Sequence, residues 1–305
     1  MTRPRAACDR RVRRPRTTAA YDRRVRCAAM AEEQGARYNR IADGYARHWG
    51  PVIRPAAVRL LDHLEPLLPG GSPRILDVGT GTGTLALAAI ERWLAVRVTG
   101  IDASSEMMAG AIRDADRRLA PSARTQFEAL VALADRLPFP DATFDLAMSS
   151  FVFQLVPNRA AALRETLRVL RPGAHLGYVT WLRTNGEVDP PDRVFDEVLA
   201  EFGFDPPEPD SNKGDPASPR AAADGMRRAG FRDVRAWPDA LVHRWSPRRY
   251  VDFLEGFAED SLFDELVARE RRAVRRRLLA RLGELRPSEL RLRLPIVYVT
   301  GRVPS

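Results

Sequence analysis

Three glycines occupy every second position of a short segment, at Gly79, Gly81 and Gly83 of ILDVGTGTGTL. An apolar run precedes them and a helix-like run follows. Glycine lets the backbone turn sharply and lets a ligand approach main-chain atoms, and a helix N-terminus offers unpaired amide donors. The spacing is G-x-G-x-G and not the G-x-G-x-x-G of dinucleotide sites, because Thr84 stands where the last glycine of that pattern belongs. The segment therefore predicts a nucleoside-binding turn.

A carboxylate follows the next apolar run. Asp102 ends VRVTGID and comes 19 residues after Gly83. An acid at the end of a second strand can accept hydrogen bonds from both hydroxyls of a ribose. Glycine turn and acid together indicate a nucleoside site. Taken singly, each is also explained by a tight strand–helix turn or by an acid that flanks a helix.

Histidines are the side chains that most often serve as general bases at neutral pH. The chain has four, at His48, His63, His175 and His243. His63 lies among leucines, which is typical of packing, and His175 follows a turn. His48 and His243 remain as weak candidates for a catalytic base, although a surface or packing role is favoured for each. The catalytic residues are otherwise unknown at this stage.

Both cysteines lie near the start of the chain, at Cys8 and Cys27. The rest of the sequence therefore has no thiol for nucleophilic catalysis, no disulfide framework and no cysteine-based zinc site. We expect no metal centre.

The elements that must position these residues alternate between strand and helix. We expect strands at 74–79, 96–102, 125–130, 144–151 and 174–181, and helices at 54–68, 84–93, 104–120 and 159–170. Such alternation predicts a parallel sheet covered on both faces. Right-handed crossovers then give a doubly wound, Rossmann-like α/β fold.

The pattern changes after Trp181. Residues 183–219 read as a loop with one short helix at 192–202, followed by a helix at 221–231. A bent strand or strand pair at 234–245 and a last strand at 292–303 bring the expected sheet to seven strands, mostly parallel. Between these strands lies a helical insertion, 247–286, which we interpret as a lid. Its arginines are expected to form a solvated face over a buried leucine stripe.

The net charge of +9 would be typical of a nucleic-acid-binding protein if it were spread over the chain, but it is concentrated in one segment. Residues 1–29 carry ten Arg and two Asp, a net of +8, which leaves 39 basic and 38 acidic side chains, a net of +1, in the rest. The main part of the chain has no global electrostatic reason to bind a polyanion, so a nucleic-acid partner is not expected.

The Arg-rich segment 1–29 is expected to be a disordered extension, because it cannot bury enough apolar surface to fold alone. Three interpretations compete: a nucleic-acid-binding or surface-binding tail, an organelle transit peptide, or upstream sequence ahead of a start at Met30. The third is favoured because composition changes abruptly there. No secretory core and no membrane span are recognised, so we expect a cytoplasmic protein in which 30–305 is the functional domain. Nothing in the sequence indicates an oligomeric state.

Four ordered segments resemble a known family: ILDVGTGTG, GIDASSEMM, RLPFPDATFDLAMSSFVFQLV and LRVLRPGAHLGYVTW. They are similar in order and spacing to class I S-adenosylmethionine-dependent methyltransferases, and most to the type 11 small-molecule group that includes quinone C-methyltransferases. The resemblance covers 38–181, which would be the cofactor-binding core, and it fades over 182–305, where such enzymes build their substrate lid.

The resemblance implies a set of S-adenosylmethionine-binding residues. These are Tyr45, Asp77, Gly79, Thr80, Gly81, Gly83, Asp102, Ala103, Met107, Leu133, Ala134 and Ser150. Many relatives have Asp or Asn where this chain has Leu133, so a side-chain contact to the adenine amino group is missing. Gln154 stands where relatives often carry His or Arg. The stretch 38–49 resembles the helix that covers the cofactor.

The acceptor is expected to be a small or medium-sized organic molecule, methylated on O, N or C. Phe151 and Trp181 would meet it near the methyl group, and Phe253 and Phe257 of the lid would complete an apolar pocket. The only lysine, Lys213, argues against a lysine-centred nucleic-acid mechanism. Two alternatives remain open: a nucleotide-dependent oxidoreductase, disfavoured by the glycine spacing, and a non-catalytic nucleoside-binding module.

Overall fold

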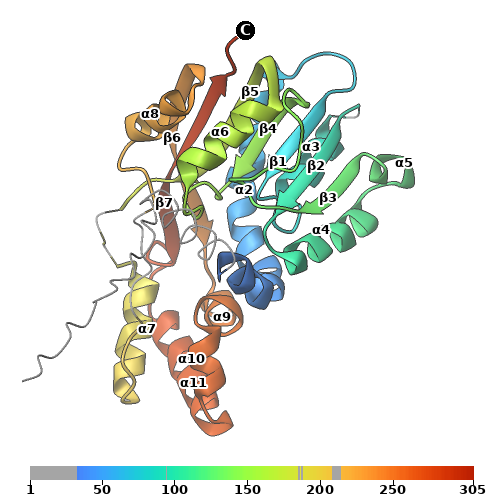
Figure 1. Ribbon diagram of the computed structural model, residues 1–305. Coiled ribbons are helices and arrows are strands. Elements are labelled where there is room, and N and C mark those ends of the chain that lie inside the picture. Colours follow the sequence, from blue (N-terminus) through green and yellow to red (C-terminus); the bar gives the residue numbers. More distant parts are fainter. Residues whose placement is uncertain (1–32, 94, 185, 187, 208–213) are drawn as a thin grey trace, which may run out of the picture.

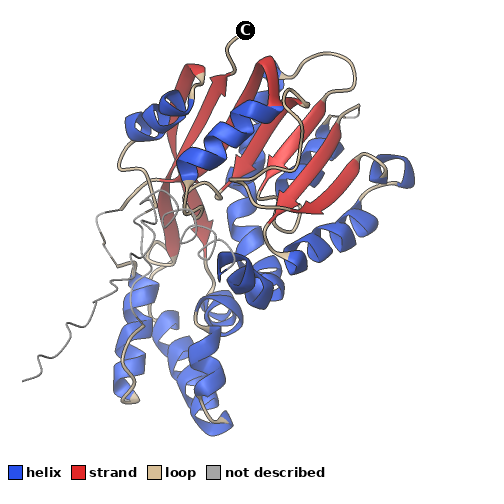
Figure 2. Cartoon of the chain, viewed as in Figure 1, coloured by secondary structure: helices blue, strands red, loops and turns tan. Residues whose placement is uncertain are grey.

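One sheet of seven strands forms the centre of the molecule (Figures 1 and 2). The computed structural model describes residues 33–305 except 94, 185, 187 and 208–213. The strand order is β3-β2-β1-β4-β5-β7-β6, and every neighbouring pair is parallel except the two that β7 makes. The strands are β1 (Arg74–Val78), β2 (Arg97–Asp102), β3 (Phe127–Val131), β4 (Phe144–Ser150), β5 (Leu170–Trp181), β6 (Arg232–Arg244) and β7 (Arg291–Arg302). The predicted fold class is confirmed.

Helices cover both faces of this sheet. Two apolar clusters lie on its two sides: α2 (Gly50–Leu64), α3 (Thr84–Arg92) and α4 (Ser105–Arg118) contribute to one, α6 (Arg159–Val169) and α8 (Pro219–Ala229) to the other. Figure 1 shows α6 and α8 in front of the strands. Neighbouring residues Ile75 and Leu76 of β1 point into opposite clusters, and both are fully buried. Burial on both faces explains why the central strands read as continuous apolar runs.

The remaining helical elements gather beyond one end of the sheet, at the lower left of Figure 1. They are α7 (Pro190–Glu201), α9 (Pro247–Phe253), the π-helical turn η3 (Leu254–Ala258), α10 (Asp260–Glu265) and α11 (Ala268–Gly283). We call these elements the helical cap. Two shorter pieces, η2 (Glu65–Leu67) and α5 (Pro121–Arg124), lie elsewhere.

The arginines of α11 are more often paired than the sequence suggested. Arg275 bonds Asp252 of α9 at 2.6 Å, and Arg281 bonds Glu197 of α7 at 2.5 Å. Arg277 bonds Glu201 of α7 at 2.6 Å. The expected buried stripe is present, formed by Val274, Leu278 and Leu282. The arginine-rich helix therefore ties the cap together and is not simply a solvated face.

Helix 33–44 continues without a break into the π-helical turn η1 (Tyr45–Trp49) and then into α2, whereas the sequence predicted two helices, 38–49 and 54–68. Pro51 does not interrupt the helix. Pro51 lies in the first turn of α2, where a missing amide hydrogen is tolerated. Gly50 instead donates its amide to the carbonyl of Tyr45, five residues back.

Two strand boundaries also differ. β5 begins at Leu170 rather than 174, because Leu170 pairs with Phe144 before a register shift brings His175 opposite Leu146. The segment expected to be a bent strand or strand pair is the single strand β6, paired with β7 along its length apart from one irregularity near Arg232.

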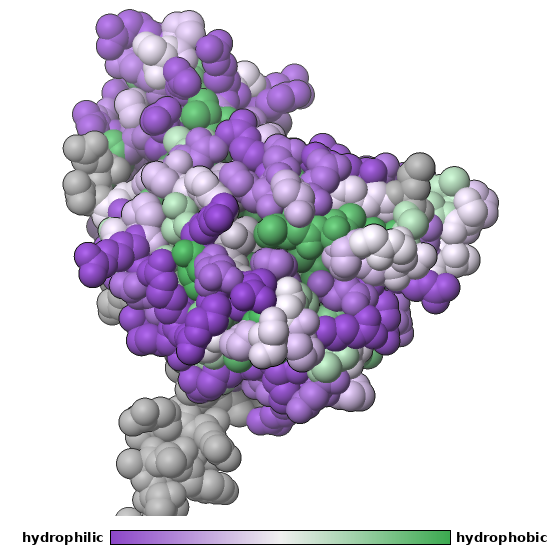
Figure 3. All heavy atoms as spheres, turned by 90° about the horizontal axis from the view of Figure 1, so that it is seen from above, coloured by the Kyte–Doolittle hydropathy of each residue, from purple (hydrophilic) through white to green (hydrophobic). Residues whose placement is uncertain are grey.

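The surface seen from above the view of Figure 1 is mostly hydrophilic, with a limited apolar area near its middle (Figure 3). Among the described residues, no helix is both long enough and apolar enough to cross a membrane.

Candidate active site

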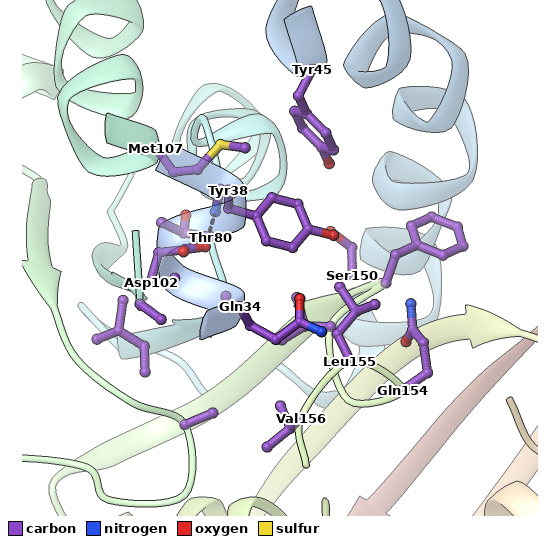
Figure 4. A pocket seen from close by; sticks show the side chains of 18 of the residues that line it. Gln34, Tyr38, Tyr45, Thr80, Asp102, Met107, Ser150, Gln154, Leu155 and Val156 are labelled. Atoms are coloured by element: carbon purple, nitrogen blue, oxygen red, sulfur yellow. Dashed lines mark hydrogen bonds between the residues drawn. The ribbon is translucent and has the colours of Figure 1, made fainter. Parts of the chain in front are cut away.

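A cavity lies where β1, β2 and β4 end, beneath helix 33–44 and η1 (Figure 4). Its empty space amounts to about 1170 Å³, the open mouth included, which is ample for a cofactor-sized ligand. Carboxyl ends of parallel strands are where α/β folds place their ligands. Twelve of the residues singled out in the sequence line it: Tyr45, Gly79, Thr80, Gly81, Asp102, Ala103, Met107, Leu133, Ala134, Ser150, Phe151 and Trp181.

The glycine turn forms the floor of the cavity between β1 and α3. Gly79 and Gly81 have φ angles of 70° and 54°, in the left-handed region that favours glycine. A Cβ on Gly79 would lie 2.3 Å from Cγ2 of Val152, so the backbone must pass close to the loop after β4. A Cβ on Gly81 would meet no atom within 4 Å. The turn therefore leaves open space beside the main chain at Gly81.

Two residues of the predicted set, Asp77 and Gly83, do not line the cavity. Asp77 is buried behind the turn and accepts a hydrogen bond from Thr80 Oγ1 at 2.7 Å. Burial raises the pKa of Asp77 to about 7, although the Thr80 hydrogen bond opposes this. A Cβ on Gly83 would lie 3.3 Å from side-chain atoms of Ala111 and Leu87, so this glycine lets α3 approach α4. Both residues support the turn.

Asp102 ends β2 and faces the cavity. Its Oδ2 accepts the amide of Gly81 at 3.0 Å, and its Oδ1 accepts the amide of Ser104 at 2.9 Å. Burial raises the pKa of this carboxyl, and the backbone donors act against that rise by stabilising the ionised form. A carboxylate has about four acceptor positions. Asp102 therefore keeps capacity for a further donor.

Helix 33–44 and η1 form the cover of the cavity, with Gln34, Tyr38 and Tyr45 directed toward it (Figure 4). The rings of Tyr38 and Tyr45 meet edge to face at 6.3 Å. Burial raises the pKa of Tyr45, and the neighbouring Tyr38 and Asp102 raise it further. Tyr45 therefore stays protonated and cannot serve as a base near neutral pH.

Asn39 anchors this cover to the start of α4. Its Oδ1 accepts the hydroxyl of Ser104 at 2.7 Å and the amide of Glu106 at 3.2 Å, with Ser105 Oγ at 3.4 Å. Unpaired amides at a helix N-terminus are normally capped from within their own chain segment. Here the side-chain oxygen of Asn39, from a helix remote in sequence, also caps the start of α4, which follows Asp102 and Ala103 in the chain.

The other end of the cover, residues 44–49, packs against the helical cap. A Cβ on Gly44 would lie 2.1 Å from the carbonyl oxygen of Gly256, and a Cβ on Gly256 would lie 2.6 Å from Nε2 of His48. Tyr45 meets Phe257 edge to face at 5.9 Å. The two π-helical turns η1 and η3 are therefore in direct contact. Glycine is required at position 44, where a Cβ would meet backbone, whereas a Cβ at position 256 would require the His48 ring to move. Such π-helical turns occur frequently at functional sites.

Ser150 and Phe151 line the far end of the cavity, next to Trp181. Phe151 has a φ of 57°, unusual for a bulky residue and costing about 1–3 kcal/mol. Its amide donates to the carbonyl of Val179, and its ring stacks on Trp181 at 4.1 Å. The preceding Ser149, by contrast, is buried and donates to the carbonyl of Val78.

The lid aromatics Phe253 and Phe257 do not themselves line the cavity. Phe257 stacks on Trp49 with centroids 6.3 Å apart and planes 11° apart, and Phe253 lies 5.5 Å from the same ring. Trp49 does line the cavity and also contacts Trp181. The two phenylalanines therefore support the wall from behind.

The two candidate bases also lie outside the lining. His48 packs under Gly256, and burial, followed by the nearby Arg47, lowers its pKa. His243 lies on β6 with its ring 4.4 Å from that of Trp245, and burial lowers its pKa too. No cluster of three or more His, Cys, Asp or Glu side chains that could hold a metal occurs in the described part of the chain.

Several lining residues had not been assigned from the sequence. They are found on the cover, on the segment after β3 and on the loop after β4, and they include Gln34, Asp135, Leu155 and Val156. Tyr38 and Trp49 also line the cavity, and both belong to the stretch 38–49 that resembled a cofactor-covering helix. The loop residues carry no pattern that distinguishes them from an ordinary turn.

Comparison with known proteins places this site in a family. Residues 76–177 match the model described as "Methyltransferase domain". The chain is 43% identical over 103 residues to a demethylmenaquinone methyltransferase of Thermus thermophilus, covering 34% of this chain and 44% of that protein. It is 32% identical over 157 residues to a 27-O-demethylrifamycin SV methyltransferase of Amycolatopsis mediterranei, covering 47% and 56% respectively.

The solved structure of the YcgJ protein from Bacillus subtilis has the same fold, with a TM-score of 0.54 at 17% identity over 82% of this chain and 99% of that one. The chain spans about half the length of the two curated relatives above. Residues 76–177 thus carry a methyltransferase domain. The strand order and the cavity at the strand ends agree with the class I methyltransferases, whose cofactor is S-adenosylmethionine.

The residues of the cavity fit that cofactor. The open space at Gly81 admits a ligand against the main chain, and the remaining acceptor capacity of Asp102 suits a ribose hydroxyl. Met107, Ala103 and Leu133 contribute apolar groups to the lining, as an adenine ring would need.

Proposed function

We propose that the protein transfers the methyl group of S-adenosylmethionine to a small or medium-sized organic acceptor. The observation that carries the proposal is the juxtaposition of the open glycine turn at Gly81 with the buried carboxylate of Asp102 in one cavity. In this proposal residues 38–181 bind the cofactor, and 182–305 shape the acceptor side.

The roles of the cofactor-binding residues follow from their positions. Asp102 accepts hydrogen bonds from the ribose, and Ala103, Met107 and the segment 132–135 enclose the adenine. The turn at Gly79–Gly81 carries the methionine part. Asp77 acts indirectly, by holding Thr80 and the turn through its hydrogen bond.

When bound, S-adenosylmethionine supplies a methyl carbon activated by a positively charged sulfur. The chain's contribution is alignment and exclusion of water, since positive charge disperses as the acceptor attacks. Tyr38 and Tyr45 of the cover present aromatic rings to the cavity, and such rings attract a cation over their faces. The cover also keeps bulk water from the reacting atoms.

The acceptor enters on the side of Phe151, Trp181 and Trp49. These rings form an apolar wall, and the cap residues Phe253 and Phe257 hold Trp49 in place. The relatives described above are named for a demethylmenaquinone and for 27-O-demethylrifamycin SV, both organic molecules with carbon skeletons that an apolar wall can accept. This supports an organic acceptor and leaves O-, N- and C-methylation open.

Calorimetric titration with S-adenosylhomocysteine tests the cofactor site. Asp102→Ala should weaken binding by about 1–3 kcal/mol, roughly five- to 150-fold, because ribose hydroxyls are left without their acceptor. Asp264→Ala serves as the control, since its side chain is 78% exposed on the cap. Equal affinity of wild type and Asp102→Ala would refute the assignment of the ribose site.

A thermal-shift panel separates the proposed activity from its alternatives. S-adenosylmethionine and S-adenosylhomocysteine should raise the melting temperature, and nicotinamide dinucleotides should not. Stabilisation by the dinucleotides alone would favour an oxidoreductase. Incubating metabolite mixtures with methyl-labelled cofactor then identifies the acceptor, and a persistent lack of label transfer would favour a non-catalytic binding module.

A further inference from the structure

The side chain of Gln154 is held from one end only. Thr180, a buried residue of β5, donates its hydroxyl to Oε1 of Gln154 at 2.7 Å. Gln154 lines the cavity beside Ser150 and Phe151, and Figure 4 shows its amide group at the cavity edge. Because Thr180 uses the carbonyl oxygen, the amide nitrogen Nε2 is the end that remains to donate. Among the described residues, no acceptor is found for it.

The turn that carries Gln154 is itself fixed. Arg159 donates Nε–H to the carbonyl of Phe153 at 2.9 Å and also bonds the carbonyl of Gly214. A Cβ on Gly214 would lie 2.1 Å from the carbonyl oxygen of Gln154, so two backbone segments pass in close contact there. The amide of Gln154 is therefore presented from a rigid support, which reduces the entropy lost when a ligand binds it.

The described part of the chain places no base at this end of the cavity. The titratable residues that line the cavity are Tyr38, Tyr45, Asp102 and Asp135. Asp102 is already engaged by two backbone amides, and burial keeps Tyr45 protonated by raising its pKa. Ser150, Phe151 and Trp181, which line the methyl-transfer end, carry no group that could act as a base near neutral pH. Among the described residues, an acceptor that needs a base would find none at this end of the cavity.

We propose that Gln154 is an acceptor-binding residue that donates its Nε2–H to an oxyanion, and that Thr180 is its positioning residue. The acceptor is then an acidic hydroxyl compound, a phenol or an enol, that binds as its anion between Trp181 and the cofactor. This inference rests on the proposed methyltransferase function and names the class of substrate for the same site.

The reaction balances without a protein base. The acceptor loses its proton to solvent before or during binding. Its oxygen, or the carbon conjugated with it in an enolate, then uses its own electron pair to form the bond to the methyl carbon. The carbon–sulfur bond breaks at the same time and its pair stays on sulfur, which gives neutral S-adenosylhomocysteine. A hydrogen bond from Gln154 stabilises the anion and fixes which atom faces the methyl group.

The test uses 4-nitrophenol as probe, because its anion absorbs visible light and its neutral form does not. The full-length protein is saturated with S-adenosylhomocysteine, and the ionisation midpoint of the bound probe is read from absorbance against pH. Gln154→Leu should make the bound probe about tenfold less acidic than in wild type, since a hydrogen bond to a charged group is lost. Thr180→Val should shift it in the same direction, and Thr180→Ser should restore the wild-type midpoint.

Thr300→Val is the matched control. Thr300 is also buried, on the neighbouring strand β7, and does not line the cavity, so this variant should leave the midpoint unchanged. Calorimetry with S-adenosylhomocysteine on every variant shows whether the cofactor site is intact. An unchanged midpoint in Gln154→Leu with normal cofactor affinity would overturn the role of Gln154. Failure of wild type to bind the probe in the presence of cofactor would overturn the phenol class. Failure of wild type to bind the cofactor at all would instead refute the proposed function.

Discussion

Gly81 offers a direct way to separate the cofactor role of the glycine turn from its role in folding. Its φ of 54° costs an L-residue about 1–2 kcal/mol, while a methyl group there would meet no protein atom within 4 Å. Gly81→Ala should therefore destabilise the fold by about 1–2 kcal/mol, a fall in melting temperature of a few degrees. The methyl group would project where the cofactor is proposed to lie, so overpacking should weaken cofactor binding by about 1–3 kcal/mol, roughly five- to 150-fold.

Two other glycines supply the controls. Gly71 has a φ of 87° and equally open surroundings but does not line the cavity, so Gly71→Ala should cost similar stability and leave affinity unchanged. Gly79→Ala should be the most destabilising of the three, because its Cβ would lie 2.3 Å from Val152. Urea unfolding gives the stabilities, and calorimetry with S-adenosylhomocysteine gives the affinities. If Gly81→Ala and Gly71→Ala bind equally well, the cofactor does not lie against Gly81 and the proposed site is wrong.

Three further predictions follow from the contacts around the cavity. Asn39→Ala should speed S-adenosylhomocysteine dissociation several-fold in stopped-flow displacement. Ser218→Ala is the control: it removes the N-cap of α8 and should destabilise the fold about as much as Asn39→Ala, without changing that dissociation rate. Phe253→Ala and Phe257→Ala should change acceptor preference or KM while cofactor affinity stays constant; a lower melting temperature with unchanged turnover would contradict the support that they give Trp49. The pKa of Asp77 is raised to about 7 in the fold, so the folded protein holds this proton more tightly than the unfolded chain does. The resulting contribution to the free energy of unfolding is full below about pH 4 and is lost as pH rises through 7. Asp77→Asn should flatten that fall in urea unfolding measured from pH 4 to 8, and an identical pH profile would show that Asp77 ionises normally.

The parts of the site that sequence reasoning found are those encoded within a few neighbouring residues. The glycine turn and Asp102 are local signals, because each requires only one strand end and the residues directly after it. The same holds for the alternation of apolar strands and amphipathic helices, which predicted the sheet. Asp77 belongs to the same motif, but its orientation away from the cavity depends on a hydrogen bond to Thr80 that no spacing reveals.

Features that depend on distant contacts were not predictable. The amide of Gln154 acquires a direction only because Thr180 lies on the adjacent strand, 26 residues later in the chain. The arginines of α11 looked like a solvated face until α7 and α9 supplied their acids. The sequence was interpreted as two helices, 38–49 and 54–68, yet the backbone continues through a π-helical turn. In each case tertiary partners decide the outcome, and local propensity does not contain them.

The contact between Gly44 and Gly256 has a consequence for protein engineering. These residues are 212 positions apart in sequence, yet a Cβ on Gly44 would clash with the backbone at Gly256, and a Cβ on Gly256 would displace the ring of His48. Grafting the cap of a related enzyme onto this core, in order to change its acceptor, would replace residues 254–258 and leave their contact partners, residues 44–49, unchanged. Residues 254–258 and residues 44–49 therefore form one exchangeable module, and a successful chimera must replace both together.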